Sequence, residues 1–270
     1  MANRYWVGGT GTWNATNTTN WSETSGGAGG ASVPTSADDV FLDANSGTAP
    51  YTVTAYDNNG FIASRMCRNL DCTGFTGTLN TDSKIEVYGS LTLNSTMGLS
   101  GANGVYNFHF KSTTTGNTVQ PGGNSAQGRL VFNGVGGEWS LQGAVSVGGS
   151  NGGIQVLAGT FISNGYSIYT GREGISSTGT AVRSLQLGAS TITISGGNFN
   201  ISGSNVTVTH TGTLTCGAFS GATFAGGGGS YGNVTLQVAA FDENIFISGA
   251  NTLRCNICKS LYDLPRLVRK

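Results

Sequence analysis

From residue 83 to about residue 250 the chain alternates short apolar runs with polar or glycine-rich breaks. Within a run, apolar and polar residues alternate with a period of two, as in TITISG at 191–196, where Ile192 and Ile194 are flanked by Thr and Ser. This period is that of a β-strand with one buried face. We expect strands within 84–93, 105–110, 129–132, 138–147, 153–157, 166–169, 184–187, 191–196, 199–203, 205–209 and 233–238.

Two all-β architectures fit so many short strands: an antiparallel β-sandwich and a parallel β-solenoid. The strands are very short, Gly stands at nearly every junction, and small residues alternate with one or two aliphatic residues. A narrow coil with sharp corners requires this combination. The pattern therefore predicts an all-β fold, a right-handed parallel β-helix (solenoid) with an N-terminal capping segment, and the antiparallel β-sandwich is the alternative.

The chain divides into three predicted parts: a Trp/Gly-rich module at 1–82, a β-solenoid body at 83–250, and a basic arm or cap at 251–270. The last boundary follows from composition, because Gly accounts for 45 of the 270 residues but is absent after Ala250.

The segment 251–270 carries a second apolar pattern. Leu253, Ile257 and Leu261 are spaced by four residues, which predicts one face of a short helix. Pro265 would end that helix, and Arg266 and Arg269 lie in the basic stretch that follows it. We expect these apolar and basic side chains to form an interface with another protein, or else to close the last coil.

Three of the four tryptophans, Trp6, Trp13 and Trp21, lie in the stretch RYWVGGTGTWNATNTTNW at 4–21, among Gly, Thr and Asn. These neighbours disfavour a helix, so the segment must be extended. An extended strip without apolar neighbours can bury its indoles only against the rest of the chain or against another chain. The three tryptophans are therefore predicted to be an interface or capping element.

Composition narrows the class of protein. Only 10% of the residues are charged, so Ser, Thr, Asn and Gln must supply the polar surface, as in extracellular or virion β-structures. The formal net charge is +0, which gives no reason to expect nucleic acid or an anionic membrane as a partner. No apolar run approaches the ~20 residues of a membrane span, and MANRYWVGG lacks the features of a signal peptide. Five cysteines, an odd number, fit folding in a reducing cytoplasm.

The opening string RYWVGGTGTWNATNTTNWSETSGGAGGASVPTSADDVFLDANSG, residues 4–47, resembles an N-terminal module of structural and fibre-like proteins of tailed phages. The later string MCRNLDCTGFTGTL, residues 66–79, resembles the stretch that joins this module to a β-helical body. The resemblance covers about the first third of the chain. It implies a virion component: a tail fibre, a tailspike-like protein or a head decoration protein.

Candidate catalytic groups are few. A glycosidase needs two carboxyl groups at a fixed separation, and Glu138 with Glu173 is a conceivable pair on neighbouring coils, although surface carboxylates are the commoner case. His109 alternates with two phenylalanines, so we expect it to face solvent, and His210 ends a strand. We therefore predict no catalytic residue and no enzymatic activity.

Candidate metal ligands are also weak. Asp38, Asp39, Asp43 and Asn45 could bind calcium, but their spacing is not that of an EF-hand, so we expect turn-capping hydrogen bonds instead. A zinc site would need Cys255 and Cys258 to be joined by two further ligands such as Cys216 and His210, and no spacing indicates this. No metal and no cofactor are predicted.

These patterns favour a non-enzymatic structural component of a tailed-phage virion, either a tail fibre or spike or a head decoration (cement) protein. The alternative is a receptor-binding or glycan-degrading tailspike-type adhesin that binds a glycan of the host surface. Expected partners are other virion proteins of the capsid or tail, and further copies of the chain in a trimer. The expected location is the virion, assembled in the host cytoplasm and released by lysis.

Overall fold

The computed structural model describes residues 1–56, 65–101, 106–126, 128–217, 223–236, 246–248 and 252–255. These residues form β-strands and turns, without a helix. The strands are β1 (Asn3–Trp6), β2 (Gly11–Trp13), β3 (Trp21–Ser22), β4 (Asp39–Phe41), β5 (Thr52–Ala55), β6 (Arg65–Cys67), β7 (Leu70–Asp71), β8 (Thr78–Asn80), β9 (Ile85–Val87), β10 (Leu91–Thr92), β11 (Gly98–Ser100), β12 (Tyr106–Phe110), β13 (Asn117–Gln120), β14 (Ser125–Ala126), β15 (Arg129–Leu141), β16 (Val145–Val147), β17 (Gly153–Ile162), β18 (Ile168–Thr170), β19 (Gly174–Ser177), β20 (Arg183–Gly188), β21 (Ile192–Ile194), β22 (Phe199–Ile201), β23 (Val206–His210), β24 (Thr213–Cys216), β25 (Thr223–Gly226), β26 (Ser230–Leu236), β27 (Phe246–Ser248) and β28 (Thr252–Cys255).

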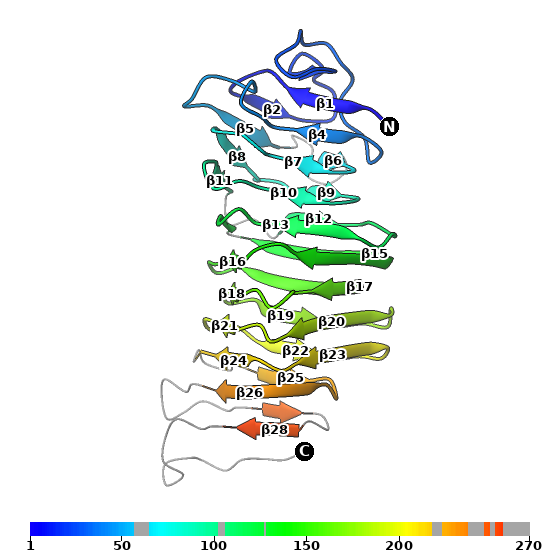
Figure 1. The fold of residues 1–270 in the computed structure, drawn as a ribbon, viewed down its shortest axis with the longest axis vertical. Helices are drawn as coiled ribbons and strands as arrows, with labels where there is room; N and C mark the ends of the chain where they lie inside the picture. The colour runs from blue at the N-terminus through cyan, green and yellow to red at the C-terminus, as the bar shows by residue number, and fades with distance from the viewer. Residues whose placement is uncertain are drawn as a thin grey trace.

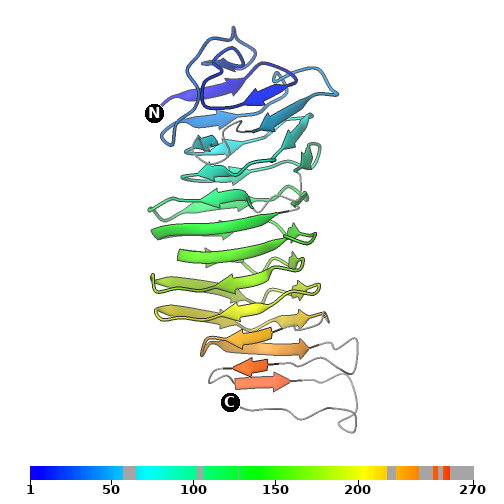
Figure 2. The same cartoon turned by 180° about the vertical axis from the view of Figure 1, so that it is seen from behind.

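Successive coils of the chain stack on one another through parallel strand pairs and form an elongated β-solenoid of about 7 turns (Figures 1 and 2). One column of paired residues passes through Phe108, Leu130, Ile154, Ile175 and Phe199. Neighbours in this column are 21 to 24 residues apart in the sequence, so a coil takes about that many residues. Stacked coils lie one strand spacing apart, ~4.8 Å.

Large apolar side chains fill the narrow interior of the coils. Phe110 stacks on Phe132 with a centroid distance of 4.6 Å, and Phe132 lies 4.9 Å from Phe161 and 5.5 Å from Trp139. All four rings are fully buried. Aromatic contacts of this kind are worth about 0.5–1.5 kcal/mol each beyond the area they bury.

Glycine is required where coils approach each other at a corner. Gly159 has φ +83, and a Cβ atom on it would lie 2.5 Å from the carbonyl oxygens of both Gly134 and Gly137. The ring of Trp139 lies 3.1 Å from the same position. Only a residue without a side chain allows this corner to close over the indole.

The N-terminal segment closes one end of the stack. β1 pairs antiparallel with β3 and parallel with β4, and β4 pairs with β7 of the next coil. β2, β5, β8 and β11 form a second, four-stranded sheet beside it. The predicted parallel β-solenoid with an N-terminal capping segment is confirmed. The sandwich alternative is wrong, because β1–β3 is the one antiparallel pair among the described strands.

Both predicted boundaries of the body fall inside the stack. In the module 1–82, β6 already pairs with β9 and β7 with β10, so the solenoid begins before residue 83. At the other end β28 pairs with β26 and carries the stack to Cys255, past residue 250. Leu253 lies within β28, so the helix predicted to include it is wrong at this residue.

Candidate functional site

The three tryptophans of the N-terminal segment pack on one another inside the cap. Trp21 lies between the other two, with edge-on ring contacts of 5.1 Å to Trp6 and 5.3 Å to Trp13. All three are at most 1% exposed within a single chain. The indoles therefore offer no surface to a partner. Of the two predicted roles, an interface or a cap, their positions support the cap.

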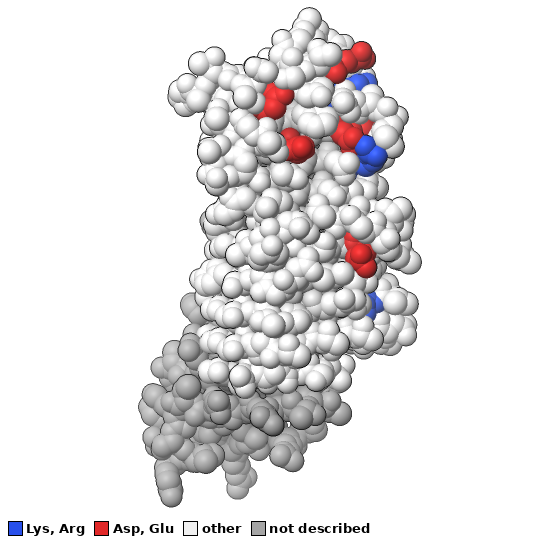
Figure 3. All heavy atoms as spheres, viewed as in Figure 1, with Lys and Arg blue, Asp and Glu red and all other residues white. Residues whose placement is uncertain are grey.

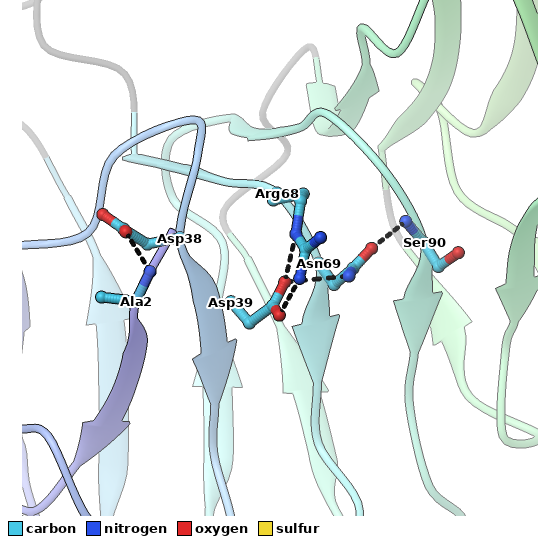
Figure 4. A network of polar contacts seen from close by, with 6 residues as sticks. All are labelled: Ala2, Asp38, Asp39, Arg68, Asn69 and Ser90. Atoms are coloured by element: carbon cyan, nitrogen blue, oxygen red, sulfur yellow. Dashed lines mark hydrogen bonds and ion pairs between the residues drawn. The ribbon is translucent and has the colours of Figure 1, made fainter. Parts of the chain in front are cut away.

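A polar ladder joins the cap to the first coils (Figure 4). Arg68 forms an ion pair with Asp39, and its Nε donates to Asp39 Oδ1 at 2.8 Å. The side-chain amide of Asn69 donates to the same oxygen at 2.8 Å, and the backbone N–H of Ser90 donates to Asn69 Oδ1 at 2.7 Å. The N–H of Thr118 donates to Ser90 Oγ at 3.0 Å. Polar side chains from successive coils thus fix the register between cap and body.

The acidic loop of the cap makes turn-capping hydrogen bonds. Asp38 accepts from the backbone N–H groups of Ala2 at 2.9 Å and Thr35 at 3.0 Å, and Asp43 accepts from the N–H of Asn45 at 2.9 Å. Burial alone would raise the pKa of Asp38, but hydrogen bonds from Thr35 and Ala2 hold it below its usual value. This confirms the predicted capping role for Asp38 and Asp43. Within the described residues no group of three His, Cys, Asp or Glu could hold a metal ion.

The densest cluster of titratable groups surrounds Glu86 on the outer side of β9 and β12. Lys84 Nζ lies 3.0 Å and Lys111 Nζ 3.5 Å from Glu86 Oε1, and His109 Nδ1 lies 4.0 Å from it. The hydroxyl of Tyr88 donates to Glu86 Oε2 at 3.2 Å. Glu86 itself is 5% exposed, so the two lysines neutralise a carboxylate that is largely removed from water.

The protonation states of this cluster do not suit proton transfer. Burial works to raise the pKa of Glu86, but Lys84 and then Lys111 and His109 lower it overall, so the carboxylate stays ionised. Burial, reinforced by Lys111, lowers the pKa of His109 to about 4, so the ring is neutral at neutral pH. A general acid or base works best with a pKa near the working pH, and neither group has one.

The proposed carboxylate pair is not brought together. Arg129, the first residue of β15, pairs with Glu173 across 2.7 Å. Glu138 lies near the other end of β15, in register with Thr160. The conceivable Glu138–Glu173 pair is therefore wrong, because the register of the coils places the two carboxylates at different corners.

The two histidines are less exposed than the sequence indicates. The side chain of His109 points away from the buried Phe108 and Phe110, as expected, but it is only 15% exposed, because the Glu86 cluster covers it. His210 is 1% exposed and its Nε2 donates to the carbonyl oxygen of Ser190 at 2.9 Å. Burial lowers the pKa of His210.

Arg183 is a buried functional group that sequence reasoning did not single out. It is 1% exposed, and its Nε donates to Ser177 Oγ at 2.9 Å and its Nη1 to the carbonyl oxygen of Ala181 at 2.8 Å. Its Nη2 donates to the carbonyl oxygens of Ser202 at 3.1 Å and Ser204 at 3.2 Å. The guanidinium holds two neighbouring coils together through their backbone.

The remaining candidate residues are structural or lie outside the described part. Cys67, Cys72 and Cys216 are buried free thiols, and burial raises the pKa of all three. Cys255 lies in β28, whereas Cys258 lies outside the described residues. Of the predicted interface in 251–270, Leu253 lies in β28, and the residues outside the described part are Ile257, Leu261, Arg266 and Arg269.

Two exposed tyrosines on the body were also missed. Tyr166 is 39% and Tyr169 42% exposed, and Tyr169 lies on the outer face of β18 in register with Ser146 and Thr193. The face formed by β16, β18, β21 and β24 carries no Lys, Arg, Asp or Glu. The signal of Tyr169 in the sequence is its place next to Ile168, which points inward, so that Tyr169 points outward; Tyr166 precedes β18, and the alternation does not predict its exposure.

No family model, no curated protein and no solved structure matches the chain. In the part of the chain that the structure describes, no helix is long and apolar enough to cross a membrane. The site is therefore interpreted from its own geometry.

Proposed function

We propose that the protein is a non-enzymatic structural component of a tailed-phage virion, a tail fibre or spike or a head decoration protein. The observation that carries the proposal is the unbroken stack from the cap to β28, whose outer faces consist mainly of Ser, Thr, Asn and Gln. Such a stack supplies a stiff rod, because the strands of each coil pair with those of the next coil. The phage assignment rests on the resemblance of residues 4–47.

The distribution of polar groups supports a structural role. Three acidic side chains form ion pairs within the fold: Asp39 with Arg68, Glu86 with two lysines, and Glu173 with Arg129. Asp39 and Arg68 belong to neighbouring coils, whereas Arg129 and Glu173 lie two coils apart, on either side of Gly153. In this proposal the partners are other virion proteins and further copies of the chain in a trimer, and the location is the particle that lysis releases.

The test is to locate the chain in particles. Antibodies against the purified chain are used to label phage particles that carry its gene, and quantitative mass spectrometry gives its copy number per particle. A fixed copy number together with labelling of the head or tail is the expected result. Particles that lack the chain, or a hydrolase activity of the purified chain on capsular or lipopolysaccharide glycans, would contradict the proposal.

A glycan-binding adhesin is the second candidate, and the exposed pair Tyr166 and Tyr169 favours it. Tyrosine rings stack on sugar faces, and the hydroxyls of Ser146 and Thr193 flank Tyr169. The absence of charge on this face among the described residues fits a neutral sugar. Tyr169→Ala should abolish retention on an array of neutral oligosaccharides, whereas Tyr56→Ala, at an equally exposed tyrosine of the cap, should not. An array that retains neither the wild type nor the variants rules this candidate out.

A further inference from the structure

Charge is unevenly distributed along the rod. Residues 1–82 contain seven acidic and three basic residues, whereas residues 251–270 contain five basic residues and one acidic residue. The first group forms the cap and the first coils, and β28 lies at the opposite end of the stack (Figure 1). The middle of the chain carries few charges of either sign.

The solvent-exposed surface of the cap is more acidic than the amino-acid composition of residues 1–82, because the fold buries basic side chains. Two of its three basic residues are withdrawn from the surface, because Arg4 is 8% and Arg65 4% exposed. The third, Arg68, has a side chain that is 33% exposed, and its charge is paired with Asp39. Arg4 Nε donates to the carbonyl oxygen of Ser32 at 2.9 Å, so its guanidinium stabilises a contact within the cap.

Four acids of the cap, in contrast, remain accessible, whereas Asp38 is buried and Asp39 is paired with Arg68. Glu23 and Asp82 are exposed, and Asp43 and Asp71 are half-buried. Figure 3 shows acidic side chains over this end of the molecule, with basic side chains beside some of them, and a largely uncharged surface over the described body. Opposite charges on the two ends of a rod attract over about a Debye length, which is about 10 Å at 0.1 M salt.

We propose that the acidic cap of one copy binds the basic segment 251–270 of a second copy, so that copies join end to end. The occupant is identified by charge complementarity, since the chain itself supplies the one strongly basic segment and the one strongly acidic end. Docking between ends continues the axis of the solenoid from one copy into the next. This inference rests on the proposed structural role and adds the partner and the surface to it.

Charge reversal on full-length chains tests the proposal. The cap variant carries Glu23→Lys and Asp82→Lys, and the arm variant carries Arg266→Glu and Arg269→Glu. The mass of each protein is measured by sedimentation velocity at low and at high ionic strength, with the high-salt form as reference. The wild type should form elongated species of higher mass at low ionic strength only, because salt screens the contact.

Each charge-changed variant alone should remain at its high-salt mass, since one of its two charged segments then has equal numbers of acidic and basic residues. An equimolar mixture of the two variants should associate again, because each supplies the end that the other lacks. Glu138→Lys, a change of an acid on the body, is the matched control and should associate like the wild type. Thermal melting of every variant checks that it is folded.

Three results would overturn the proposal: a wild type whose mass is the same at low and high salt, reversed variants that associate as well as the wild type, or a mixture that stays unassociated. Association is measured on purified protein and the structural role on particles, so either can fail without the other.

Discussion

Replacing Trp21 by Ala should destabilise the cap more than any other single change in residues 4–21. The side chain is 0% exposed and makes edge-on contacts with both Trp6 and Trp13. An aromatic side chain buries ~200 Å², which at ~25 cal/mol per Å² corresponds to ~5 kcal/mol, and Trp→Ala changes in cores cost about 3–5 kcal/mol. We therefore expect a loss of about 4 kcal/mol in the free energy of unfolding of the cap.

Urea denaturation monitored by tryptophan fluorescence measures this loss, and amide hydrogen exchange shows where it falls. In a solenoid each coil contacts only its neighbours, so the loss should be concentrated in β1 to β7, while β20 to β24 keep their protection. Trp21→Phe is the matched control. It retains an aromatic ring and removes a buried indole N–H that has no hydrogen-bond partner, so it should cost less than ~1.5 kcal/mol.

The reasoning fails if Trp21→Ala lowers the free energy of unfolding by less than about 1 kcal/mol, the scale of an ordinary surface change. It fails equally if protection is lost evenly from the cap to the last coil, because the cap would then not be a separate element of stability.

Three further changes test other parts of the structure. Arg183→Ala should cost about 3 kcal/mol in chemical denaturation, because it leaves the buried Ser177 hydroxyl and partly buried carbonyl oxygens without their donor; a change below 1 kcal/mol would show that water replaces the guanidinium. Burial lowers the pKa of His210 and brings that of His109 from 6.5 to about 4, so the unfolded chain binds more protons between these values. The melting temperature should therefore fall as the pH decreases from about 6.5 to about 4, and His109→Gln should flatten the slope. Gly159→Ala should cost more than ~2 kcal/mol, whereas Gly165→Ala, with a similar φ but no atom within 4 Å, should cost about 1 kcal/mol; equal losses would mean that φ alone matters.

Local pattern determines which face of each strand is buried. In β21 the alternation of Ile192 and Ile194 with Thr193 was sufficient to predict a strand with two inward side chains, and both isoleucines are buried. The same reasoning missed β19, GISS, and β24, TLTC, because each has a single large aliphatic residue and no extended run of alternation. Their strand conformation comes from pairing with β17 and β21 on the preceding coils.

What only the tertiary structure decides is which residues of different coils meet. Coils in register are about 21 to 24 residues apart without a strict repeat, so no spacing in the sequence reveals that Gly134, Gly137 and Gly159 close over Trp139. The burial of Arg183 and His210 depends on loops of neighbouring coils for the same reason. The sequence by itself determined many strands of the body, the glycine corners and the need to bury three indoles. Stacking decided that these indoles bury one another within a single chain, because contacts between coils depend on register, which local pattern does not encode.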